Sequence, residues 1–253
     1  PGDRPTIRTR RIPVGEDVSN IHVSPSAQRL VLEARGDIWS LPADDGPARN
    51  LTRSDDQADR DPTWSPDGQW IAFFSDRSGE YELWIQQSDG RGEARQITTD
   101  GGVFKTALGW NPAGTCFAFG DMTGTVYVYS VEDESVATMD QDPIAELPSV
   151  TWSPDGRWLV YDRTQDDTLH RALWAYDTDS GTRHRLTSGM FSDGSPTFDR
   201  DGEFLYFTSN RSFRPTYSNV DDTFIYDDGG MLMMAPLRAD IESPWLVEIN
   251  EEE

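Results

Sequence analysis

The chain has 253 residues, enough for one large domain or two small ones with a sizeable core. It carries 45 acidic against 22 basic residues, and this net charge of -23 argues against DNA or RNA as a partner, because phosphate binding needs clustered Lys and Arg. A single cysteine, Cys116, excludes an internal disulfide and a cysteine-rich zinc site, and its apolar neighbours indicate a buried structural thiol.

The acidity is mostly aspartate, with 31 Asp and 14 Glu, and Lys105 is the only lysine. Dense carboxylates keep a surface hydrated where molar salt screens charge, so this bias suggests a halophile, with a GC-rich genome as the alternative explanation. No apolar stretch approaches the roughly 18 residues of a membrane span, and the N-terminus, PGDRPTIRTRRIP, lacks the apolar core of a signal peptide. We therefore expect no membrane partner and no export signal.

Residues 5–14, PTIRTRRIPV, resemble the outer strand of a sheet and come before five copies of one repeat. Each copy has an apolar or aromatic anchor followed by a turn of the WSPDG type and a second apolar run. The intervals between anchors are 41, 46, 42 and 46 residues, and the anchors are Val23, Trp64, Trp110, Trp152 and Phe198. This period is typical of a four-stranded blade of a β-propeller.

Every repeat is expected to supply antiparallel strands in the same order. The anchor ends an inner strand, the SPDG turn reverses the chain, and an apolar run such as WIAFF forms the second strand. A third strand alternates apolar and polar residues, as in ELWIQQS, and a short, polar, Arg-bearing fourth strand such as ARQIT suits an outer edge. The irregular segment NVDDTFIYDDGGMLMM interrupts the fifth repeat.

We therefore predict an all-β fold: a single β-propeller domain over residues 1–253, with four-stranded antiparallel blades and five visible repeats. Residues 245–253 are interpreted as an acidic tail or linker, and residues 5–14 as a strand that closes the ring by completing the last blade. Two interpretations stay open: the repeats form a closed ring of five blades, or the chain is a fragment of a larger propeller.

The WSPDG repeats with ARQIT-like outer strands resemble the TolB-type propellers. Within that group, the segments DRDPTWSPDGQWIAFFSDRSGEYELWIQQSDGRGEARQIT and GEFLYFTSNRSFRPTYSNVDDTF resemble the second propeller of the tricorn protease family, over about residues 10–245. That resemblance implies a non-catalytic domain of a cytoplasmic serine peptidase, which guides or filters oligopeptides through its channel and docks to other domains or subunits. The family's propeller has seven blades, whereas five repeats are visible here.

Catalytic chemistry of its own is not expected. The three histidines, His22, His170 and His184, are far apart in sequence, with neither a G-x-S-x-G elbow nor metal-ligand spacing. The paired aspartates lie mostly in predicted turns, where a solvated acidic surface explains them better than glycosidase chemistry. We expect no metal and no cofactor.

If the propeller binds a ligand, the starts of the inner strands and the loops before them are the best candidates. The candidate residues are Asn20, Arg60, Asp61, Lys105, Thr106, Ser149, Asp193, Ser195, Arg211 and Arg214. Arg60 and Lys105 could hold a peptide carboxylate, and Arg211 and Arg214 form a second basic group, although any of these cations could instead pair with a neighbouring aspartate. The alternative function is a free-standing TolB-like scaffold that presents a rim to a protein partner.

Overall fold

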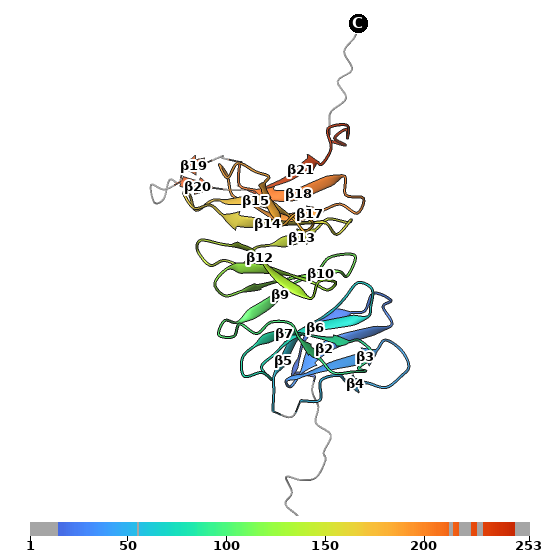
Figure 1. The fold of residues 1–253 in the computed structure, drawn as a ribbon. Helices are drawn as coiled ribbons and strands as arrows, with labels where there is room; N and C mark the ends of the chain where they lie inside the picture. The colour runs from blue at the N-terminus through green and yellow to red at the C-terminus, as the bar shows by residue number, and fades with distance from the viewer. Residues whose placement is uncertain (1–14, 55, 213–214, 218–223, 227–229, 246–253) are drawn as a thin grey trace, which may run out of the picture. The chain divides into compact units, whose positions relative to one another are not determined.

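The computed structural model describes residues 15–54, 56–212, 215–217, 224–226 and 230–245 (Figure 1). The chain divides into two compact units, residues 1–102 and 103–253. Both consist of antiparallel strands joined by short turns, as the repeats predict. Over the described ranges there is no helix long and apolar enough to cross a membrane.

Unit 1 holds the first two repeats as two four-stranded sheets, each with its strands in chain order. The first sheet consists of β1 (Val18–Val23), β2 (Arg29–Ala34), β3 (Asp37–Pro42) and β4 (Arg49–Asn50). The second consists of β5 (Asp59–Trp64), β6 (Trp70–Ser75), β7 (Glu82–Gln87) and β8 (Arg95–Gln96). The predicted anchors Val23 and Trp64 are the last residues of β1 and β5.

Unit 2 holds the remaining three repeats as the third, fourth and fifth sheets of the chain. The third sheet consists of β9 (Lys105–Trp110), β10 (Cys116–Asp121), β11 (Thr125–Ser130) and β12 (Ser135–Gln141). The fourth sheet consists of β13 (Val150–Trp152), β14 (Trp158–Thr164), β15 (Arg171–Asp177) and β16 (Thr182–Arg185). The fifth sheet has three strands, β17 (Asp193–Phe198), β18 (Phe204–Ser209) and β21 (Met231–Pro236).

The fifth repeat differs from the others between its second and third strands. There the chain forms a separate two-stranded hairpin of β19 (Pro215–Tyr217) and β20 (Phe224–Tyr226) before it returns as β21. Within the described residues this sheet lacks the fourth strand that the other four sheets have. The predicted closing strand, residues 5–14, and most of the predicted tail, residues 246–253, lie outside the described residues.

The SPDG turn is held by its own side chains and backbone. In the second repeat, Trp70 donates its backbone N–H to Ser65 Oγ at 2.9 Å, and Ser65 also bonds the Asp67 carboxylate. Gly68 closes the turn onto the Ser65 carbonyl at 2.9 Å with φ of 74°, a left-handed conformation that favours glycine. The same Ser, Asp and Gly contacts recur at Ser153. The recurring turn therefore satisfies its polar groups internally.

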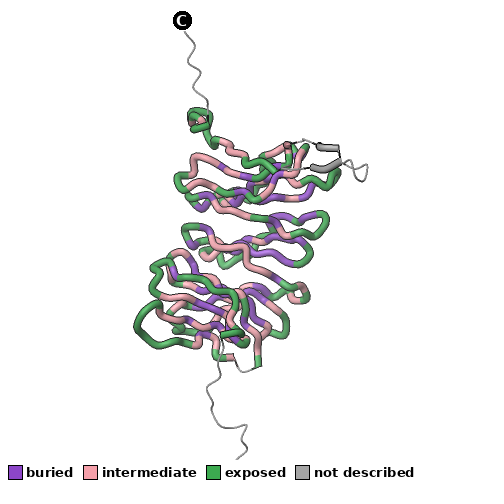
Figure 2. Tube along the Cα trace, turned by 180° about the vertical axis from the view of Figure 1, so that it is seen from behind, coloured by how far each residue is buried: buried purple, intermediate pink, exposed green. Residues whose placement is uncertain are grey.

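Buried residues lie along the strands of both units (Figure 2), and the apolar ones among them form clusters between neighbouring sheets. In unit 1, Trp64 of β5 packs with Val31 and Ile38 of the first sheet and with Leu51, which directly follows β4. In unit 2, Trp152 is partly buried against a cluster that joins the third and fourth sheets, and Phe198 lies against one that joins the fourth and fifth. The anchors Trp64, Trp152 and Phe198 thus pack between neighbouring sheets of one unit, whereas Val23 at the end of β1 is 55% exposed.

Candidate functional site

Three inner strands carry a β-bulge at the same place in the repeat, three residues before the anchor. Asn20, Asp61 and Ser195 each adopt a left-handed backbone conformation there, with φ of 50°, 51° and 52°. The strand pairing of β1, β5 and β17 shifts at these points. Asn and Asp tolerate this conformation better than most residues, so the bulge fits their short polar side chains. All three are candidate site residues.

In unit 1 the structure brings three of the candidates together. Asn20 Nδ2 donates to Glu33 Oε2 at 2.9 Å, which links β1 to the second strand of the same sheet. Burial raises the pKa of the Asp61 carboxyl, and the negative charge of Glu33 adds to the effect while Arg60 opposes it. The Arg60 side chain is exposed and its guanidinium lies 5.5 Å from the centre of the Tyr81 ring. We call Asn20, Glu33, Arg60, Asp61 and Tyr81 the unit 1 cluster.

In unit 2 a buried carboxylate links two further candidates. The backbone N–H groups of Ser149 and Ser195 donate to Asp162 at 2.9 and 3.3 Å, one to each oxygen. Arg171 Nη2 lies 2.6 Å from Asp162 Oδ1, and its Nη1 lies 2.6 Å from Glu146. Burial raises the pKa of Asp162, although Arg171 and the two backbone donors partly offset this effect. Through its two backbone hydrogen bonds, Asp162 links Ser149, just before β13, to Ser195 in β17.

Lys105 and Thr106 begin β9, but Lys105 is not at the surface. Its side chain is 1% exposed, and in the strand pairing it lies opposite Asp121. Burial alone would raise the pKa of Asp121, but hydrogen bonds from Thr123, Tyr127 and the Thr125 backbone outweigh it and hold the pKa below its ordinary value. Thr106 is half-buried. The carboxylate-binding role of Lys105 stays a prediction.

The candidates Asp193 and Arg211 form an ion pair that the second repeat also contains. Arg211 Nη2 lies 3.1 Å from Asp193 Oδ1, and its Nε donates to Ser209 Oγ at 2.7 Å. The equivalent residues of the second repeat are Asp59, Ser75 and Arg77, with corresponding distances of 2.8 and 2.9 Å. In both repeats the aspartate is fully or almost fully buried and the guanidinium lies over aromatic rings. Arg214 lies outside the described residues.

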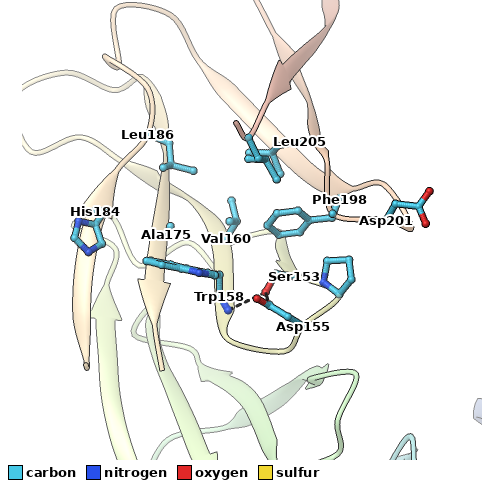
Figure 3. Close-up of a pocket in the computed structure, with 13 residues that line it drawn as sticks. Ser153, Asp155, Trp158, Val160, Ala175, His184, Leu186, Phe198, Asp201 and Leu205 are labelled. Atoms are coloured by element: carbon cyan, nitrogen blue, oxygen red, sulfur yellow. Dashed lines mark hydrogen bonds between the residues drawn. The ribbon is translucent and has the colours of Figure 1, made fainter. Parts of the chain in front are cut away.

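A separate, mostly apolar pocket of about 520 Å³ lies between the fourth and fifth sheets of the chain, both of which belong to unit 2. Figure 3 shows Val160, Leu205 and Phe198 at its centre, with the Trp158 and His184 rings on one side and Asp201 at the other. The two rings meet edge to face with centroids 5.8 Å apart. Leu186, 45% exposed, lines this pocket, whereas its equivalent Leu51 in unit 1 is covered by the chain around Gly90.

Each of the three histidine rings lies within hydrogen-bond distance of a neighbouring group. His22 Nδ1 accepts the Trp64 backbone N–H at 3.2 Å, His170 Nδ1 lies 2.9 Å from the Met190 carbonyl, and His184 Nε2 lies 3.1 Å from Thr182 Oγ1. Over the described ranges, no three His, Cys, Asp or Glu side chains are grouped so that they could hold a metal ion.

Sequence analysis did not identify Glu33, Asp162 or Arg171, because each belongs to a second or third strand and reaches the inner-strand site only through strand pairing. The one sequence clue was the pair of motifs SDR at Ser75–Arg77 and SNR at Ser209–Arg211, each following an apolar second strand. These motifs mark the repeated ion pair.

Residues 18–253 match the family described as the tricorn protease second β-propeller domain. Tricorn protease homolog 1 of Streptomyces coelicolor is 27% identical over 87% of this chain and 21% of its own length. The uncharacterized peptidase YuxL of Bacillus subtilis is 31% identical over 65% of this chain and 24% of its own length. The chain thus spans about a quarter or less of these relatives.

Among solved structures, the crystal structure of the tricorn protease matches all of this chain and 25% of that chain, with a TM-score of 0.77 and 17% identity. The structure of a putative TolB from Agrobacterium tumefaciens matches 86% of this chain and 79% of that chain, with a TM-score of 0.56 and 20% identity. These likenesses identify the fold as propeller-like. Together with the match over residues 18–253, they show that the chain belongs to the family of the tricorn protease second β-propeller domain.

Proposed function

We propose that this chain is a non-catalytic accessory domain of a tricorn-like serine peptidase, which binds oligopeptides along its inner strands, guides them through a channel, and docks to other domains or subunits. The cytoplasmic location that the resemblance implies is part of this proposal. It is supported by the family to which the chain belongs and by the names of its relatives, several of which are peptidases.

The observation that carries the proposal is the unit 1 cluster. Arg60 is an exposed cation at the start of an inner strand in a protein of net charge -23, and its ring neighbour Tyr81 holds it over an aromatic face. A guanidinium in this setting can bind a peptide carboxylate with charge-assisted hydrogen bonds. The side chain of Asn20 and the peptide groups of the bulged strands β1 and β5 supply further polar groups beside it.

The test is the binding of a fluorescein-labelled dodecapeptide, measured by anisotropy, with a free or an amidated C-terminus. We expect Arg60→Ala to weaken binding of the free-carboxylate form about tenfold, since a charge-assisted hydrogen bond contributes roughly 1.5 to 3 kcal/mol. The matched control is Arg91→Ala, because Arg91 is 86% exposed and pairs with Asp89 in an outer loop. Mass spectrometry of the peptide should show no cleavage.

If the Arg60→Ala and Arg91→Ala variants bind the free-carboxylate peptide equally tightly, the proposal is wrong. Cleavage of the peptide by this chain alone would also contradict it. The TolB-like structures favour a second candidate, an interaction scaffold for a folded protein. Such a scaffold would bind neither form of the short peptide.

A further inference from the structure

Five of the exposed large apolar side chains of unit 2 lie on one set of loops. These loops either join the second to the third strand of a sheet or lead from one sheet into the next inner strand, so they share one edge of the sheets. Five large side chains on them are between 45% and 80% exposed: Phe104, Met122, Ile144, Leu169 and Met190. We call these five side chains the apolar rim.

The loops at the opposite edge are different. The turns that follow the anchors, residues 111–114, 153–156 and 199–202, carry polar and small residues and no exposed large apolar side chain. The described loops between third and fourth strands, residues 131–134 and 178–181, carry no such side chain, and the described segment that follows β21 carries two, Leu237 and Trp245. Scattered exposed apolar residues need no explanation, but five on the loops of one edge, against Leu237 and Trp245 after β21, do.

The members of the apolar rim lie on loops that contact one another. The Met122 backbone N–H donates to the Phe104 carbonyl at 3.1 Å, and His170, next to Leu169, lies 2.9 Å from the Met190 carbonyl. Between these two pairs, the loop that contains Ile144 is fixed to both sides: Asp142 N donates to Gly124 O at 3.0 Å, and Asp142 Oδ2 accepts from Thr164 N at 2.8 Å.

The charges beside the apolar rim determine what it can bind. Glu146 and Asp166 present carboxylates that are 53% and 75% exposed, whereas Arg163 and Arg171 are 15% and 23% exposed and each is paired with carboxylates. An open pocket of about 610 Å³ lies between Met122 and the 141–145 loop, and Asp142, Asp166 and Arg163 are its charged lining residues. Because Arg163 is paired with Asp140 and Asp166, a cationic side chain entering this pocket would meet the exposed Asp166 carboxylate beside the apolar surface of Met122.

The apolar rim also lies beside the predicted peptide-binding residues. Phe104 directly precedes Lys105 and Thr106 at the start of β9, and the Ile144 loop leads to Ser149. A short peptide bound along the inner strands of unit 2 would cross these loops. This placement, with the exposed carboxylates and the open pocket, favours an extended oligopeptide as the occupant.

We propose that the apolar rim binds oligopeptides that carry apolar side chains next to Lys or Arg. This inference rests on the proposed function and names the class of peptide that the domain selects. Apolar side chains would cover Met122 and Leu169, and basic side chains would meet Glu146 and Asp166. Because these carboxylates are exposed, the charge preference should weaken as salt increases.

The test uses three fluorescein-labelled nonapeptides and the whole chain. The first contains leucine and arginine, the second replaces arginine by glutamate, and the third replaces leucine by serine. We expect the first to bind most tightly, and the double variant Met122→Ser, Leu169→Ser to bind it about tenfold more weakly. Leu237→Ser is the matched control, with an exposed leucine at the opposite edge and an expected change of less than about twofold.

Both variants replace exposed side chains, so an unchanged melting temperature and circular dichroism spectrum should accompany the binding result. If the first peptide binds the double variant as it binds the wild type, or if the glutamate peptide binds equally well, the inference is wrong while the proposed function stands. If none of the peptides binds the wild-type chain, the proposed function fails as well.

Discussion

The repeated ion pair gives a sharp prediction about stability. Asp59 is fully buried and accepts hydrogen bonds from Arg77 Nη2 at 2.8 Å and Ser54 Oγ at 2.7 Å. The Arg77 side chain is 18% exposed and lies about 5 Å from the Phe73 and Trp84 ring centres. Arg77→Met keeps an apolar chain over these rings but leaves the buried carboxylate without its cation. Breaking a buried pair in this way costs about 3 to 5 kcal/mol of unfolding free energy.

The double variant Asp59→Asn, Arg77→Met removes the uncompensated charge, so it should recover most of this loss and cost about 1 to 2 kcal/mol. Arg211→Met tests the equivalent pair in unit 2, where the arginine is 32% exposed and solvent screens the remaining charge, so its cost should be smaller. The measurement is urea denaturation followed by tryptophan fluorescence. A loss below about 1 kcal/mol for Arg77→Met would show that Asp59 does not depend on its cation.

Three further predictions concern packing, pH and salt. Trp64→Ala should lower the free energy of unfolding by about 3 to 5 kcal/mol in urea denaturation, because Trp64 is 5% exposed. Trp152 is only partly buried, so Trp152→Ala should cost less, and equal losses would show that the two side chains are equally well packed. Burial and Glu33 raise the pKa of Asp61, so its charge opposes folding at neutral pH. Asp61→Asn should therefore raise the melting temperature at pH 7, with a gain that shrinks to nothing as the pH falls towards about 3.9. If the acidic composition is a halophile's, molar salt should raise the melting temperature, and an unmoved transition would rule that explanation out.

The repeat was predictable because its determinants are local. An aromatic anchor, a Ser-Pro-Asp-Gly turn and an apolar run specify strand, reversal and strand within about a dozen residues, and all five predicted anchors end an inner strand in the structure. The outer strands were found at the predicted places, although two of them, β4 and β8, are only two residues long. Strands this short contain too few residues to show an alternating sequence pattern.

The site was harder to predict, because its contacts depend on strand register. Asp162 reaches Ser149 and Ser195 from a second strand, and the burial of Lys105 follows from its position opposite Asp121. A lone lysine in an acidic sequence gives no indication of such a partner. The apolar rim was also missed, since Met122 and Leu169 lie in polar turns with no periodic pattern, and only the fold brings their loops to one edge of the sheets.

Photo-crosslinking can show whether oligopeptides bind to the inner strands and to the loops beside them. A peptide carrying one benzophenone group and an arginine-leucine sequence would be irradiated with the whole chain, and the modified residues mapped by mass spectrometry. We expect adducts at residues 18–22 and 59–63 and on the loops around residues 104, 122, 144, 169 and 190. Adducts confined to the outer strands β8, β12 and β16, or to the SPDG turns, would contradict this expectation.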